Sequence, residues 1–248
     1  MPPKTPRPHD ASQRSAASHG APQRSTALHD APPPPRGPRI LSLVGQKGGV
    51  GKTTITLSLA VEAAERGLRV LVVDADPQGS ARMWAEIAQE LGTSVPLVVA
   101  TPLGAQSHRQ IPEMAAPYDL VLIDCPPRLD EVQRLAMMVS ELVLLPVGPA
   151  PFDVLALRKA IELVAAAQEV RPALRAAVVI TRTQPKTTLA RELRAQLAPI
   201  RPPVLAAELG FRAAYQQMIA AGMGPTTFEP GGAAAREVRA LCDELEIR

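Results

Sequence analysis

The feature that most constrains the fold of this chain is a glycine-rich segment, GQKGGVGKTT at residues 45–54, which follows an apolar run and precedes a helical stretch. Glycines in this setting let the backbone bend so that several N–H groups point at phosphate oxygens, and the following helix adds its positive N-terminal end. Lys52 is expected to reach the β- and γ-phosphates of a nucleotide, and Thr53 to ligate Mg²⁺ through its hydroxyl. Gln46 replaces the first glycine of the common G-x-x-x-x-G-K-[ST] pattern, and a second lysine, Lys47, follows it. The segment predicts a strand–loop–helix unit that binds phosphate.

Apolar strands alternate with helical stretches from residue 39 onward. Strands are expected at 39–44, 69–73, 97–100, 119–123, 142–147 and 176–180. Helices are expected at 52–66, 80–91, 129–139, 152–169 and 188–197, with Gly67 closing the first of them. Because the strands are apolar throughout rather than alternating, both of their faces should be buried. The sequence therefore predicts one α/β domain over 39–248, a single doubly wound, mostly parallel sheet flanked by helices.

Residues 1–38 have a different character. They are rich in Pro, Ser, Ala and Arg and contain a ten-residue near-repeat, HDASQRS at 9–15, HGAPQRS at 19–25 and HDAPPPP at 29–35. With almost no bulky apolar side chains, this stretch cannot offset the entropy of ordering, which predicts a disordered tail. Composition favours a low-complexity tail over the alternative, a short adaptor motif for a partner.

Carboxylates end two further apolar strands. VLVVDADPQGS ends its strand with Asp74 and Asp76, and YDLVLIDCPP ends its strand with Asp124. Ligands gather at the C-terminal ends of parallel strands, so these side chains are expected beside the glycine-rich loop, with Asp124 facing the metal. Cys125 and Cys242 lie far apart and match no metal-ligand spacing, which disfavours a disulfide framework or an iron–sulfur site.

Three segments carry a family resemblance. KGGVGKTT at 47–54, DADPQG at 74–79 and IDCPP at 123–127 resemble the deviant Walker motifs of the ParA/MinD P-loop ATPases, and the similarity continues through ITRT at 180–183 and FRAAYQQMIAAGMGPTTFEP at 211–230. Partition members of this family commonly have QKGG, as here at Gln46. The resemblance is to a small ParA-type partition or positioning ATPase, because 38 residues are too few for the helix-turn-helix domain of longer plasmid relatives.

The resemblance implies roles for individual residues. It implies ATP and Mg²⁺ as cofactors and a nucleotide site made of Gly48, Gly49, Val50, Gly51, Lys52, Thr53 and Thr54, with Thr181 and Arg182 near the adenine. Lys47 would reach across a nucleotide-sandwich homodimer to the partner's phosphates, as an arginine finger does. Asp76 would orient the attacking water, and Asp124 would hold the Mg²⁺ shell with Thr53. Asp74 would support either that shell or only its own loop.

The distribution of charge suggests a polyanionic partner. Residues 171–212 hold eight basic residues against Glu192 and Glu208, although the chain as a whole has a net charge of only +3. The expected partner is DNA bound without sequence specificity. The candidate DNA-binding residues are Arg182, Lys186, Arg191, Arg194, Arg212, Arg236 and Arg239. A solvated basic face is the alternative.

The expected function is that of an ATP hydrolase, slow alone and stimulated by a ParB-like or cargo-adaptor protein, that partitions or positions a chromosome, plasmid or other cargo. A cytoplasmic location is expected, because the chain has no apolar run of about 18 residues and no signal peptide, and the expected DNA binding implies association with the nucleoid. Membrane attachment is not expected, because acidic residues line one face of the C-terminal AREVRALCDELEIR segment. The alternatives are an ATP-dependent enzyme of the same fold that activates a small carboxylate, and a regulator that binds ATP with little turnover.

Overall fold

The computed structural model describes residues 37–100, 103–128, 130–184 and 187–248. All but the last two residues of the predicted tail, 1–38, lie outside these ranges, and so does the candidate DNA-binding residue Lys186. Within the described residues, no helix is long and apolar enough to cross a membrane.

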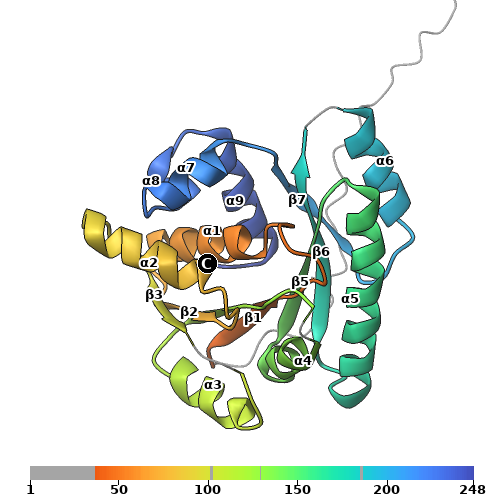
Figure 1. The fold of residues 1–248 in the computed structure, drawn as a ribbon, viewed down its shortest axis with the longest axis horizontal. Helices are drawn as coiled ribbons and strands as arrows, with labels where there is room; N and C mark the ends of the chain where they lie inside the picture. Colours follow the sequence, from red (N-terminus) through yellow and green to blue (C-terminus); the bar gives the residue numbers. More distant parts are fainter. Residues whose placement is uncertain (1–36, 101–102, 129, 185–186) are drawn as a thin grey trace, which may run out of the picture.

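A seven-stranded sheet forms the centre of the described chain (Figure 1). Its strands are β1 Arg39–Leu43, β2 Val70–Asp74, β3 Leu97–Ala100, β4 Leu120–Asp124, β5 Leu142–Val147, β6 Arg175–Thr183 and β7 Val204–Gly210. They lie in the order β3-β2-β4-β1-β5-β6-β7, and every pairing is parallel. The predicted doubly wound parallel sheet is therefore confirmed. The strand order changes direction at β1, so the loop after β1 opens at the point where such sheets bind ligands.

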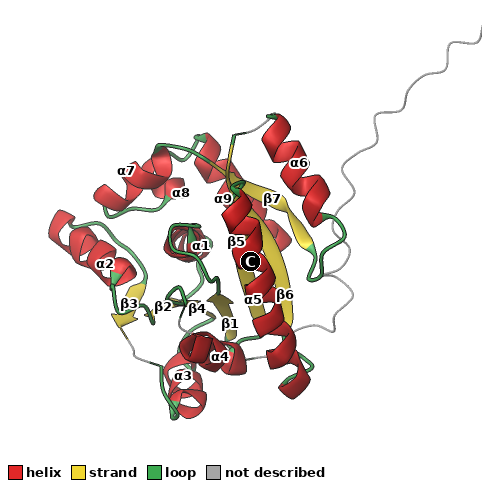
Figure 2. Cartoon of the chain, turned by 45° about the vertical axis from the view of Figure 1, so that its right-hand side comes forward, coloured by secondary structure: helices red, strands yellow, loops and turns green. Residues whose placement is uncertain are grey.

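Helices cover both faces of the sheet. They are α1 Lys52–Glu65, α2 Ser80–Leu91, α3 Ser107–Ala115, α4 Asp130–Val139, α5 Pro151–Val170, α6 Thr188–Leu197, α7 Ala214–Ala220, α8 Pro225–Phe228 and α9 Ala233–Glu244. Side chains of α1, α2, α7 and α9 pack with one face of the sheet, and those of α3 to α6 pack with the other. In Figures 1 and 2, α2 lies at the β3 edge of the sheet and α6 at the opposite, β7 edge. The result is a three-layer α/β/α domain.

Several elements go beyond the sequence-based expectation. The six predicted strands and five predicted helices are present, and Gly67 follows α1 with φ 87° and donates its N–H to Ala64 O, as a C-terminal cap residue does. The strand β7 and the helices α3, α7 and α8 were not predicted. β7 is a half-exposed edge strand, so its burial pattern lacks the continuous apolar run that marks the central strands.

Side chains occupy the outer backbone of β7. The carboxylate of Glu244 on α9 accepts hydrogen bonds from the N–H groups of Ala206 and Ala207, each at 2.8 Å. Arg194 on α6 donates to the carbonyl oxygens of Leu205 at 3.2 Å and Ala206 at 3.3 Å. Helices from both layers thus hold this strand.

Candidate functional site

The glycine-rich loop joins β1 to α1 at the centre of the sheet. Gly49 has φ 74° and Gly51 has φ 97°, and these left-handed conformations are open to glycine at little cost. Gly51 is the N-cap of α1, whose first turn holds no acidic side chain. The unpaired N–H groups at the start of α1 therefore meet no competing carboxylate from their own helix, which suits them to bind an anion.

Lys52 points back into this loop. Its ammonium group donates to the carbonyl oxygens of Lys47 at 3.2 Å and Gly45 at 3.5 Å, and the residue is buried. Burial lowers the pKa of Lys52 below its usual range, and the nearby carboxylate of Asp124 acts in the opposite direction. The loop therefore contains a desolvated cation where the sequence places the phosphates.

Thr53 and Asp124 meet beside this cation. The Thr53 hydroxyl donates to Asp124 Oδ2 at 2.6 Å, and the other oxygen, Asp124 Oδ1, is buried without a hydrogen-bond partner among the described residues. Burial raises the pKa of Asp124 to about 7, the Thr53 hydrogen bond opposes this shift, and the charge of Asp74 adds to it. A buried carboxylate oxygen with a free lone pair next to a hydroxyl fits an Mg²⁺ ion, which takes a few protein oxygens and completes its shell with phosphate and water.

Asp74 and Asp76 follow β2 and have different surroundings. Asp74 is buried, and its two oxygens accept the N–H groups of Asp76 at 3.2 Å and of Arg82, in the first turn of α2, at 3.0 Å. Asp76 is half-buried, accepts the N–H of Gln78 at 2.9 Å, and lines a cavity of about 450 Å³ together with Lys52 and Thr53. Asp74 thus stabilises the loop that presents Asp76 to the cavity.

Lys47 extends in another direction. Its ammonium group forms an ion pair with Asp153 in the first turn of α5, where the side chain of Lys47 is 35% exposed and that of Asp153 only 2%. The two lysines of the loop therefore have separate environments. The ammonium group of Lys52 lies inside the loop, and that of Lys47 lies against Asp153 of α5. Sequence reasoning missed Asp153, because no local pattern links it to a lysine 106 positions away.

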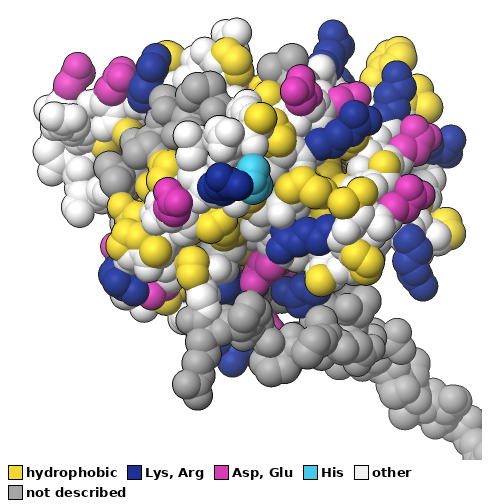
Figure 3. Space-filling view, turned by 90° about the horizontal axis from the view of Figure 1, so that it is seen from below, with side chains coloured by type: hydrophobic (Ala, Val, Ile, Leu, Met, Phe, Trp, Pro, Cys, Tyr) yellow, Lys and Arg dark blue, Asp and Glu magenta, His cyan; other side chains and the backbone are white. Residues whose placement is uncertain are grey.

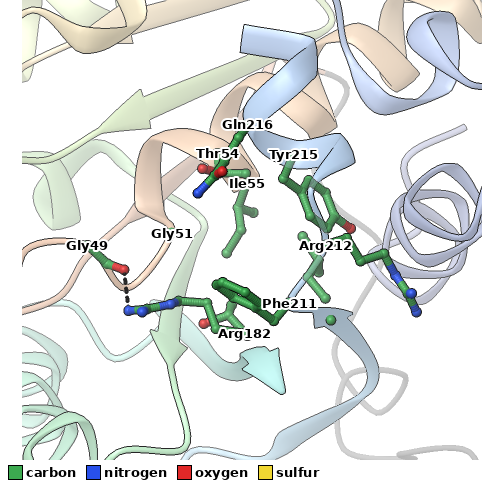
Figure 4. Close-up of a pocket in the computed structure, with 12 residues that line it drawn as sticks. Gly49, Gly51, Thr54, Ile55, Arg182, Phe211, Arg212, Tyr215 and Gln216 are labelled. Atoms are coloured by element: carbon green, nitrogen blue, oxygen red, sulfur yellow. Dashed lines mark hydrogen bonds between the residues drawn. The ribbon is translucent and has the colours of Figure 1, made fainter. Parts of the chain in front are cut away.

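A second cavity, of about 330 Å³, lies on the other side of the loop (Figure 4). The end of β6 borders it: the Thr181 hydroxyl donates to Val50 O and the Arg182 guanidinium to Gly49 O, both at 2.8 Å. Its apolar lining comes from Ile55, Leu209, Phe211 and Tyr215, and Figure 4 shows the Phe211 ring beside the Arg182 side chain. A flat aromatic base would fit against such a lining. Sequence reasoning placed only Thr181 and Arg182 here, although Phe211 and Tyr215 lie in a segment that it had singled out.

The described DNA-binding candidates do not form one free basic cluster. Arg194 is paired with Glu208 at 2.8 Å and Arg212 with Glu237 at 2.8 Å, so carboxylates neutralise both locally. Arg182 contacts the loop, as described above, and Arg191 contacts Thr188 on its own helix at 3.5 Å.

Arg236 and Arg239 donate to the carbonyl oxygens of Gly231 and Pro230 before α9, and Arg239 also lies 3.7 Å from Glu62. Arg236 is exposed and Arg239 half-buried. On the face seen in Figure 3, Lys and Arg side chains are interspersed with Asp and Glu. Besides Arg182 at the end of β6, the exposed candidates among the described residues are Arg191 on α6 and Arg236 on α9.

Comparison with known proteins gives matches across the α/β domain. Residues 41–226 match the family described as the CobQ/CobB/MinD/ParA nucleotide binding domain. The maintenance of carboxysome distribution protein A of Halothiobacillus neapolitanus is 30% identical over 210 residues, which cover 83% of this chain and 95% of that protein. The chromosome-partitioning ATPase Soj of Thermus thermophilus is 34% identical over 190 residues, which cover 64% of this chain and 75% of that protein.

Solved structures share the fold. The septum site-determining protein MinD of Pyrococcus horikoshii, complexed with Mg-ADP, matches with a TM-score of 0.67 at 20% identity, over 84% of this chain and 96% of that chain. An ATP complex of a McdA variant from Cyanothece matches with a TM-score of 0.67 at 17% identity, over 85% of this chain and 97% of that chain.

Proposed function

The chain belongs to the CobQ/CobB/MinD/ParA family of nucleotide-binding domains, and from this premise we propose that it is an ATPase that pairs with a second copy when it binds ATP, and so drives the positioning of a cellular cargo. The observation that carries the proposal is the separation of the two loop lysines. Lys52 points into the loop and would bind the phosphates of its own protomer, whereas the ammonium group of Lys47 is paired with Asp153 on α5, which would take no part in phosphate binding.

Residues of one protomer would hold the nucleotide. The N–H groups at the start of α1 and the ammonium of Lys52 would bind the phosphates, and the cavity bordered by Arg182 and Phe211 would take the adenine. When bound, Mg²⁺ supplies positive charge to the β- and γ-phosphate oxygens. Thr53 Oγ1 and the unpartnered oxygen of Asp124 would hold it. Asp76, at the edge of the same cavity, would orient the attacking water.

The proposed switch moves Lys47 from one anion to another. In a single protomer its charge compensates the nearly buried carboxylate of Asp153. In the pair, Lys47 would reach the triphosphate of the partner, where a delivered cation stabilises charge on the transferring phosphoryl group. The contact with the partner's phosphates must then offset the loss of the Asp153 ion pair, which favours pairing only when the triphosphate is present.

The pair would bind DNA without sequence specificity, through Arg191 and Arg236, in the cytoplasm and on the nucleoid. Pairing doubles the number of phosphate contacts, and such multivalency raises affinity steeply. The printed names of two relatives refer to carboxysome distribution and chromosome partitioning, which supports a positioning role and leaves the cargo of this chain to be identified. A ParB-like or cargo-adaptor partner would stimulate hydrolysis and release the pair.

The proposal is tested with Lys47→Ala. This variant should bind ATP with nearly unchanged affinity but stay monomeric with Mg-ATP, as measured by size-exclusion chromatography with light scattering. Lys159→Ala, which removes an exposed lysine from the same helix as Asp153, should dimerise like the wild type. An unchanged ATP-dependent dimer in Lys47→Ala would refute the proposed role of this lysine.

A further inference from the structure

A fully buried glutamine on α4, Gln133, bridges the two loops of the candidate site. Its amide nitrogen donates one hydrogen bond to Gly45 O at 3.3 Å, at the start of the glycine-rich loop. It donates a second to Pro126 O at 2.7 Å, two residues after the candidate metal ligand Asp124. A buried amide that is fully paired fixes the distance between the groups that it joins, because breaking either bond leaves an unsatisfied buried polar group.

Gln46 completes the bridge. Its amide nitrogen donates to Gln133 Oε1 at 3.3 Å and to the carboxylate of Asp130 at 2.6 Å. The acceptors fix the orientation of both amides: the carbonyls of Gly45 and Pro126 cannot donate, so Gln133 must turn its NH₂ group toward them and its oxygen toward Gln46. All four amide protons of the two side chains then have partners.

The bridge connects the phosphate-binding part of the candidate site, at Lys52, with its candidate metal-binding part, at Asp124. The carbonyl of Gly45 also accepts from the ammonium group of Lys52, at 3.5 Å. Through this shared acceptor and through Pro126, Gln133 connects the phosphate-binding lysine to the strand end that presents Asp124. Gln46, which occupies the first glycine position of the common phosphate-loop pattern, contacts the oxygen of Gln133 through its amide group.

We propose that Gln133 is a positioning residue for the metal–nucleotide complex, with Gln46 as its support: the pair sets the spacing between the glycine-rich loop and the loop after β4. The inference rests on the proposed function in requiring that the chain bind Mg²⁺ and a nucleotide, but it requires neither pairing nor DNA. With the bridge intact, Thr53 and Asp124 reach the metal while Lys52 holds the phosphates. Without it, the phosphates still bind, and the metal adds less affinity.

The matched test is Gln133→Met, which keeps the length and approximate volume of the side chain and removes both donors. The affinity for ADP is measured by calorimetry in EDTA and in excess Mg²⁺, because ADP binding needs no second copy. The affinity of the variant for ADP in EDTA should be within about twofold of the wild-type value. The gain in affinity on adding Mg²⁺ should fall about tenfold, the order of magnitude expected for the loss of two buried hydrogen bonds. Gln46→Met should reduce the same gain about threefold, by the loss of one supporting bond.

A buried polar residue that only stabilises the fold would behave differently. Ser140→Ala removes another buried hydrogen bond, to Ala136 O at 2.8 Å at the end of α4, and should leave the Mg²⁺ gain unchanged. The double variant Gln46→Met/Gln133→Met should lose no more of the gain than Gln133→Met alone, because Gln46 acts through Gln133.

Either of two results with Gln133→Met would overturn the inference. One is an unchanged Mg²⁺ gain in Gln133→Met, and another is an equal loss of affinity with and without Mg²⁺. If Gln133→Met does not fold, an unchanged gain in Gln46→Met has the same force. A wild-type protein that does not bind Mg-ADP would instead overturn the proposed nucleotide binding, and the inference with it.

Discussion

Replacement of Asp124 by asparagine should remove one contribution that makes the Mg²⁺-free, nucleotide-free protein less stable as the pH rises. Burial raises the pKa of this carboxyl from 3.8 to about 7. An acid whose pKa is raised by folding binds its proton more tightly in the folded chain than in the unfolded chain. The free energy of unfolding therefore falls as the pH rises, from its full value below about pH 4 to its lowest value above about pH 7.

The size of the effect follows from the shift. A rise from 3.8 to about 7 corresponds to about 4 kcal/mol, of which about 3 kcal/mol falls between pH 5 and pH 8. The side chain of the Asp124→Asn variant would carry no titrating proton and could still accept the hydrogen bond of Thr53 through its amide oxygen. Asp124→Asn should therefore be more stable than the wild type at pH 8, by a margin that shrinks toward pH 5.

The measurement is urea unfolding of both proteins in EDTA at several pH values between 5 and 8. The difference between the two proteins cancels the titration of all groups that Asp124 does not influence. Added Mg-ADP should stabilise the wild type at pH 8 and have a much smaller effect on Asp124→Asn, because the metal requires the ionised carboxylate. Parallel pH profiles for the two proteins would refute the assignment of a raised pKa to Asp124.

Three further predictions concern other parts of the molecule. In thermal unfolding, Gly222→Ala should lower stability by about 2–3 kcal/mol, because the φ of Gly222 is +58° and an added Cβ would lie 2.5 Å from the backbone of Ala88. Gly92→Ala, also at positive φ but with open space around it, should cost only about 1 kcal/mol. Phe211→Ala should weaken ATP binding about tenfold in calorimetry by removing a stacking surface, and pyrophosphate binding should stay the same. Arg236→Ala should weaken DNA binding of the ATP form in a filter-binding assay, whereas Arg212→Ala should mainly lower the melting temperature, since it breaks the ion pair with Glu237; equal losses of DNA affinity in both would contradict this distinction.

The sequence predicts the centre of the sheet well because each signal there is local. Continuous apolar runs mark the central strands, and the loop glycines and the carboxylates Asp74, Asp76 and Asp124 lie at or directly after the ends of strands β1, β2 and β4. The parallel topology then places these strand ends at one edge, so a pattern along the chain becomes a site in space.

Contacts between distant segments could not be predicted in this way. Asp153 is an ordinary first-turn acid of a helix until the fold places Lys47 beside it. Gln133 is a polar residue in an amphipathic helix, and only the tertiary structure shows that it is buried between two loops. The excess of positive charge in residues 171–212 also led to too high an estimate of the number of basic side chains without an acidic partner. The partner of Arg212, Glu237, lies outside that segment.

The side chains that hydrogen-bond to the edge strand β7 limit how copies of this protein can associate through their sheets. An edge strand with open backbone groups invites any extended peptide, including the same strand of another copy, to extend the sheet. Here the carboxylate of Glu244 and the guanidinium of Arg194 occupy N–H and carbonyl groups along that border. Another strand could therefore pair continuously along this edge only if these hydrogen bonds were first broken, so sheet extension at β7 is disfavoured.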